Sequence, residues 1–232
     1  MLDDLLASSS HRRGFLGRVG AAMGIGLMAG LPAGPAAEPG RHIDPMDIDK
    51  DDKWLAGLTG KHRCLFDMPT PDDGIGLLHI RNWLNTWRDT YGMKDAELNA
   101  VSTLYGKTIP LGFSDEMWVK YPFGAALSIN DPATKAPLKR NMFAHPKPGD
   151  TIAFGMLDVA IEALQARGTT FILCNNALDF WVGKLAAGGA GKPADIKADL
   201  LAHLLPKVVV VPAMVVAITK AQEKGITYKY LG

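Results

Sequence analysis

The chain has 232 residues, with 25 lysines and arginines against 24 aspartates and glutamates. The first 37 residues contain three of the arginines and two of the aspartates, so the remainder carries 22 residues of each sign and is formally neutral. A neutral chain without a basic stripe lacks the charge pattern that binds nucleic acid, and we expect no nucleic-acid partner. The remainder is long enough for one α/β domain with its own core.

Cysteine and histidine usage limits the metal and cofactor chemistry. Cys64 and Cys174 are the two cysteines, too few for a disulfide-stapled scaffold or a structural zinc site. The six histidines show no HxxxH or HExxH spacing, and the CxxCH haem motif does not occur. Neither a GxGxxG nor a GxxxxGK[ST] loop is present. The sequence therefore predicts no metal site and no cofactor.

The N-terminal segment has the layout of an export signal. A polar start leads to the pair Arg12-Arg13, which Phe15-Leu16 and the weakly apolar run Val19–Leu31 follow. This order resembles a bacterial twin-arginine translocation signal, which sends a folded protein across the cytoplasmic membrane. An amphipathic N-terminal helix is the alternative. We expect the rest of the chain to work in the periplasm, on the outer face of that membrane.

Residues 1–37 have two alternative fates. The uncharged stretch Val19–Ala37 approaches the about 20 residues of a spanning helix, but it contains several glycines and two prolines. The small residues Gly34–Ala37 suit a signal peptidase. The segment is therefore either a retained membrane anchor or a cleaved signal.

The remaining chain predicts alternating strands and helices after a tether. Residues 38–60 are rich in proline, glycine and aspartate and predict an exposed tether. Short apolar runs then alternate with segments of helical periodicity. The predicted strands are 62–67, 98–105, 170–174, 208–211 and 226–231. The predicted helices are 75–91, 151–167, one that begins at 175, 193–205 and 213–224, with a short one after Ser114.

Two features of this pattern bear on the architecture. Valine-rich strands such as Val208–Val211, alternating with helices, are typical of a parallel sheet with both faces covered. Residues 121–150 contain five prolines and predict a long irregular segment. Such a long loop in a compact domain is usually functional or an interaction surface.

Four short blocks, in order along the chain, resemble the DsrE/DsrF-like family. They are Asn82–Asn85, Leu104–Gly106, Gly168–Leu178 with its cysteine, and Leu205–Ala213 followed by Gln222–Tyr228. The resemblance covers residues 61–232, with 121–150 as a Pro-rich insertion. It implies a flavodoxin-like three-layer α/β/α sandwich with a mainly parallel sheet of about five strands, which assembles into trimers or hexamers. It also implies that Cys174 carries a persulfide in a sulfur relay.

This chain departs from the family pattern in two respects. Its N-terminal segment indicates export, whereas characterised members act mostly in the cytoplasm. Tyr105 stands where relatives often have a histidine before the glycine. Both departures weigh against sulfur transfer.

The predicted strand ends give the candidate site. Ligands of parallel α/β sheets bind at the carboxyl ends of the strands. These ends present Asp67, Tyr105, Gly106, Asn175 and Asn176 as candidate ligand-binding residues. The two asparagines have helix capping as the simpler alternative.

Cys174 is the candidate catalytic residue. It sits where a strand meets a helix, so backbone N–H groups and the helix dipole favour a nucleophilic thiolate. The alternative is a small, buried, inert cysteine. We expect no Cys64–Cys174 disulfide, because Cys64 lies near the start of its strand and Cys174 at the end of another.

Aromatic residues near the Pro-rich insertion predict a partner surface. Trp118, Tyr121 and Phe123 lead directly into it and, if exposed, are the best candidates for protein contacts. Trp83 and Trp87 share one helical face and indicate core packing instead.

Three functional hypotheses follow. The first is an exported, non-catalytic accessory or binding subunit on the outer face of the cytoplasmic membrane, in a membrane complex such as an electron-transfer complex. Its partners would be that complex or further copies of the chain, and the N-terminal segment would hold it to the membrane. The alternative is a periplasmic sulfur-relay protein with a persulfide on Cys174. A third is a secreted small-molecule binding protein with a pocket at the strand ends.

Overall fold

The computed structural model describes residue 49 and residues 52–232 of the chain. The predicted signal or anchor, residues 1–37, lies outside the described residues. So does most of the first half of the predicted tether.

The described domain is organised around a five-stranded sheet in which every pair of neighbouring strands is parallel. The strand order is β4-β3-β2-β1-β5. The strands are β1 His62–Asp67, β2 Leu98–Leu104, β3 Thr170–Cys174, β4 Val208–Val211 and β5 Thr227–Tyr230. The predicted α/β class with a five-stranded parallel sheet is confirmed.

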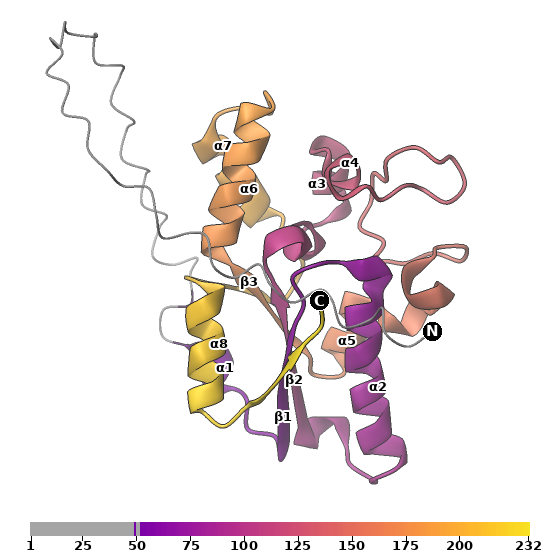
Figure 1. The fold of residues 1–232 in the computed structure, drawn as a ribbon, viewed down its shortest axis with the longest axis vertical. Helices are drawn as coiled ribbons and strands as arrows, with labels where there is room; N and C mark the ends of the chain where they lie inside the picture. The colour runs from indigo at the N-terminus through magenta and orange to yellow at the C-terminus, as the bar shows by residue number, and fades with distance from the viewer. Residues whose placement is uncertain (1–48, 50–51) are drawn as a thin grey trace, which may run out of the picture. The chain divides into compact units, whose positions relative to one another are not determined.

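Helices cover both faces of this sheet. Figure 1 shows α1 and α8 on one side of the sheet and α2 and α5 on the other. The α-helices are α1 Lys53–Ala56, α2 Ile75–Asp89, α3 Asp115–Lys120, α4 Phe123–Leu127, α5 Ile161–Ala166, α6 Asn175–Ala187, α7 Pro193–Ala202 and α8 Met214–Glu223. The 3₁₀ turns are η1 Asp72–Gly74, η2 Asp95–Glu97, η3 Gly106–Gly112, η4 Ile152–Gly155 and η5 Leu157–Val159.

The strand sequences are apolar on both faces because each face contributes to a separate core. Successive strand residues point to opposite faces. Accordingly, Cys64 and Phe66 belong to the core beneath α2, whereas Leu65 belongs to the core beneath α8. This double burial explains why the strands read as continuous apolar runs.

The predicted helix 151–167 is wrong in its first half. Only Ile161–Ala166 is α-helical, and the preceding residues form two 3₁₀ turns. Ala153 and Phe154 have φ angles of 42° and 63°, which no α-helix accommodates. Ile152 packs so closely on Gly74 that a Cβ at the glycine would lie 2.5 Å from it. This tertiary contact outweighs the local helical periodicity.

Part of the predicted tether belongs to the domain. Trp54, Leu55 and Leu58 are buried in the core beneath α8. The Asp49 N–H donates to the carbonyl of Val210 at 2.8 Å, which ties this segment to the edge strand β4. The segment is rich in proline and aspartate, and this composition predicted a tether. Its short apolar stretch nevertheless covers one face of the sheet.

The proposed partner surface of Trp118, Tyr121 and Phe123 is wrong, because all three side chains are buried. The Trp118 ring packs edge-on against Phe123, with ring centroids 5.9 Å apart, and its Nε1 donates to the Pro110 carbonyl. The Tyr121 hydroxyl donates to Asp199 at 2.7 Å. These residues form the core that attaches the insertion to the domain.

Replacing Trp118 by alanine should therefore destabilise the domain rather than affect a partner. We expect Trp118→Ala to lower the free energy of unfolding by about 3–5 kcal/mol through the cavity it creates. Its neighbour Val119 is 64% exposed in the same helix, and Val119→Ala should change that free energy by less than about 0.5 kcal/mol. Chemical denaturation of both variants tests this, and equal stabilities would contradict it.

Candidate functional site

The carboxyl edge of the sheet has a switch point between β3 and β4. After β3 the chain enters α6, whose Leu178 and Val182 pack in the core beneath α2. After β4 it enters α8, whose Met214 and Ala217 pack in the core on the opposite face. The two helices therefore leave neighbouring strands in opposite directions, which is where ligands bind in open parallel sheets.

Cys174 lies at this switch point, between two helix N-termini. Its Sγ accepts the N–H of Ala177 at 3.4 Å and the N–H of Met214 at 3.3 Å. The first donor belongs to α6 and the second to α8. Two such donors, each at the positive end of a helix dipole, stabilise negative charge on a sulfur atom. The side chain is nearly covered, with 5% exposure.

Cys64 has a different environment. It is free and fully buried, in the core on the opposite face of the sheet from Cys174. Burial raises the pKa of the Cys64 thiol, so its neutral form is favoured. The structure confirms the expectation that the two cysteines are unpaired.

Asp67, at the end of β1, is the centre of a hydroxyl network. Its carboxylate is buried, with 3% exposure of the residue. It accepts hydrogen bonds from the Thr103 hydroxyl at 3.0 Å, the Tyr105 hydroxyl at 3.3 Å and the Tyr228 hydroxyl at 2.6 Å. Three donors compensate the cost of burying this polar group. The network links the ends of β1 and β2 to β5.

The same network changes the titration of its tyrosines. Burial and the neighbouring Asp67 raise the pKa of Tyr105 well above its ordinary value. Burial and the hydrogen bond to Asp67 raise the pKa of Tyr228 to about 12. Both hydroxyls therefore remain neutral donors at physiological pH.

The predicted site residues separate into distinct groups. Asp67 and Tyr105 come together as expected, but Cys174 is on β3, with β2 between it and Asp67. The Gly106 carbonyl accepts a hydrogen bond from the Trp181 indole at 2.7 Å and so anchors α6. The side chain of Asn175 donates to Asp179, and Asn176 is exposed.

Sequence reasoning missed two side chains and one backbone group of this edge. Thr103 and Tyr228 complete the Asp67 network, and the Met214 N–H is the second donor to Cys174. Tyr228 and Tyr230 alternate on the last strand, a signal that places both hydroxyls on one face. The Met214 donor has no sequence signal, because any residue at that position provides an N–H.

Apolar side chains are exposed along the same edge. Val215 and Val216 lie at the start of α8, and Tyr228 and Tyr230 lie at the end of β5. Val215 is 73% and Tyr230 59% exposed. We call these four residues the carboxyl-edge surface. Exposed aromatic and aliphatic residues of this kind characterise protein contacts.

Comparisons with known proteins do not place the chain in a family. No protein-family model and no curated protein matches the chain. The chain is similar to the solved structure of a protein of unknown function, MTH1491, from Methanobacterium thermoautotrophicum. It is 19% identical, over 73% of this chain and 99% of that one, with a TM-score of 0.38.

Over residue 49 and residues 52–232, no helix has the length and apolar character needed to cross a membrane. Nor does any cluster of three or more histidine, cysteine, aspartate or glutamate residues there form a candidate metal site.

The tyrosine network predicts a pH-dependent stability. Because folding raises the pKa of Tyr228 from 10.0 to about 12, its stabilisation is complete below the lower value and is lost as the pH rises towards the higher one. We expect the double variant Tyr105→Phe/Tyr228→Phe to be less stable at neutral pH, by about 1–3 kcal/mol for each lost donor to Asp67. Its stability should then fall less steeply above about pH 10 than that of the wild type.

Urea denaturation at a series of pH values measures this effect. Tyr91→Phe is the matched control, because Tyr91 is exposed and its substitution should not change how steeply the stability falls above about pH 10. If the stability of the double variant falls as steeply as that of the wild type, the network does not control the pH dependence.

Proposed function

We propose that the chain is an exported, DsrE-like binding or accessory subunit that works on the outer face of the cytoplasmic membrane, in a membrane complex such as an electron-transfer complex. The arginine pair Arg12-Arg13 and the apolar run behind it support export. The four sequence blocks support the DsrE-like assignment. The N-terminal segment would hold the chain at the membrane if it is retained.

The carboxyl-edge surface is the observation that carries this proposal. Val215, at the start of α8, and Tyr230, at the end of β5, are each more than half exposed. Interfaces favour aromatic residues that lose little conformational freedom on binding. The hydrogen bond of 2.6 Å from Tyr228 to Asp67 fixes that ring before a partner arrives. Exposed apolar side chains and one preorganised ring are features of a protein-binding surface.

Sulfur relay through Cys174 is the second candidate, and the two N–H donors to Sγ favour it. In this reaction the Cys174 thiolate attacks the outer sulfur of a donor persulfide. A sulfur–sulfur bond forms at Cys174, the sulfur–sulfur bond of the donor breaks, and the donor leaves as a thiolate. The backbone donors would stabilise the resulting persulfide anion. Exposure of only 5% means that the helix starts must separate slightly to admit the donor.

Partner capture tests the first proposal. We expect the full-length chain, extracted from its native membranes in mild detergent, to co-purify with stoichiometric partner subunits. The double variant Val215→Ser/Tyr230→Ser should capture at least about tenfold less of the partner than the wild type does. Phe154→Ser is the matched control, since Phe154 is 81% exposed away from this surface. A free, monodisperse soluble protein would contradict the proposal.

Persulfide trapping tests the second candidate. The folded protein is incubated with glutathione persulfide, and its intact mass is measured after removal of the donor. If Cys174 is the carrier, the wild type and Cys64→Ala gain one sulfur atom and Cys174→Ser gains none. An unmodified wild type, or sulfur uptake that persists in Cys174→Ser, rejects the sulfur-relay function.

A further inference from the structure

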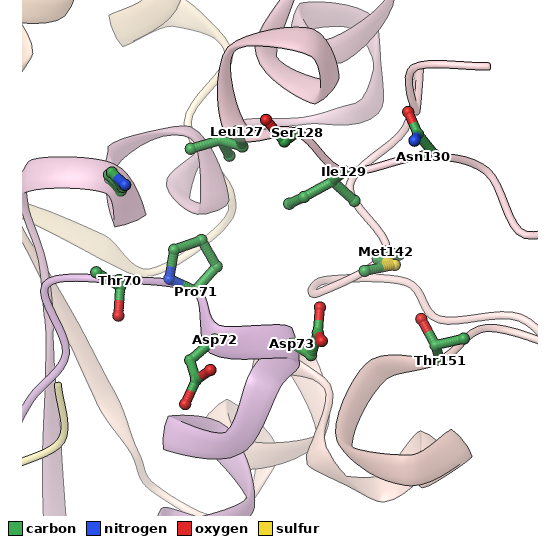
Figure 2. A pocket seen from close by; sticks show the side chains of 11 residues that line it. Thr70, Pro71, Asp72, Asp73, Leu127, Ser128, Ile129, Asn130, Met142 and Thr151 are labelled. Atoms are coloured by element: carbon green, nitrogen blue, oxygen red, sulfur yellow. The ribbon is translucent and has the colours of Figure 1, made fainter. Parts of the chain in front are cut away.

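A pocket of about 350 Å³ lies beside the carboxyl end of β1, between the loop that leads into α2 and the insertion (Figure 2). The loop contributes Thr70–Asp73, and the insertion contributes Leu127–Asn130 and Met142. Thr151 lines it as well. The volume is at the lower end of the range of about 300–1,000 Å³ for small-molecule sites.

Charges of both signs line this pocket. In Figure 2 the Asp73 carboxylate is directed towards Ile129 and Met142, whereas the Asp72 carboxylate points the opposite way. Lys107 adds a positive charge to the lining. Within the residues that the structure describes, neither Asp73 nor Lys107 has an ion-pair partner. One inward carboxylate and one ammonium group match a ligand that itself carries one charge of each sign.

The rest of the wall accommodates an aliphatic group. Pro71, Leu127, Ile129 and Met142 are the apolar residues of the lining, and the majority of the lining is polar or charged. Thr70, Ser128 and Thr151 contribute hydroxyl groups. Polar groups beside apolar side chains orient a small ligand in such sites.

Backbone packing holds Asp73 in place. Asp72, Asp73 and Gly74 all have left-handed φ angles, 37°, 45° and 82°. Left-handed residues other than glycine cost about 1–3 kcal/mol each and persist only where the surroundings fix them. Here Gly74 packs directly against Ile152, with no room for a Cβ. The carboxylate of Asp73 is therefore presented from a fixed backbone.

We propose that this pocket binds a small α-amino acid with an aliphatic side chain. Its ammonium group pairs with Asp73 and its carboxylate with Lys107, while its side chain contacts Leu127 and Ile129. This role goes beyond the protein contacts of the carboxyl-edge surface, because it uses the α2 side of the sheet. It also gives a location and a ligand class to a small-molecule function at the strand ends.

Binding of L-leucine and of its two half-molecules tests the proposal. Isothermal titration of the full-length chain should show tighter binding of L-leucine than of 3-methylbutylamine, which lacks the carboxylate, or 4-methylpentanoate, which lacks the ammonium group. Asp73→Asn should weaken L-leucine binding by at least about tenfold, since it removes a charge-assisted hydrogen bond. Lys107→Met should remove the preference for L-leucine over 3-methylbutylamine.

Asp195→Asn is the matched control. It makes the same substitution at an exposed residue of α7 that does not line the pocket. Asparagine tolerates the left-handed backbone of Asp73 at least as well as aspartate, so both variants should fold. Asp195→Asn should keep L-leucine affinity within about threefold of the wild type. No measurable L-leucine binding, equal losses in the two variants, or equal binding of the three probes would overturn the proposal.

Discussion

Helices must cover both faces of the parallel sheet, and this requirement determines where the domain can bind a ligand or a partner. Four strands follow one another across the sheet with their connecting helices on one face, and the last crossover returns along the other face to place β5 beside β1. As a result, α6 and α8 diverge from neighbouring strands at a switch point. The starts of both helices direct an N–H at Cys174, and β5 brings Tyr228 to Asp67.

The carboxyl edge therefore has two chemically different sides. On the α8 side, the hydrogen-bonded Tyr228 and the exposed Val215, Val216 and Tyr230 present apolar groups that suit a protein partner. On the α2 side, the insertion and the loop before α2 line a small pocket with charges of both signs. The insertion can do this because Trp118 and Phe123 bury it firmly against the domain. A single edge of the sheet could thus join a partner to a small ligand.

The sequence predicted the features that depend on local pattern. Apolar runs located all five strands, and their ends brought Asp67 and Tyr105 to one edge because parallel strands share their direction. The features that the sequence did not predict depend on tertiary contacts. The burial of Trp118 and the left-handed turn at Ala153 depend on packing between distant segments. The pairing of Tyr228 with Asp67 depends on β5 returning to β1, which strand periodicity does not encode.

Export to the outer face of the membrane is the claim on which the proposed role depends, and protease accessibility in intact spheroplasts tests it most directly. We expect external protease to digest the wild-type chain. The variant Arg12→Lys/Arg13→Lys, expressed at the same level, should remain protected until the spheroplasts are lysed, because the proposed export signal depends on the arginine pair. A wild-type chain that is protected in intact spheroplasts and digested only after lysis would contradict the account.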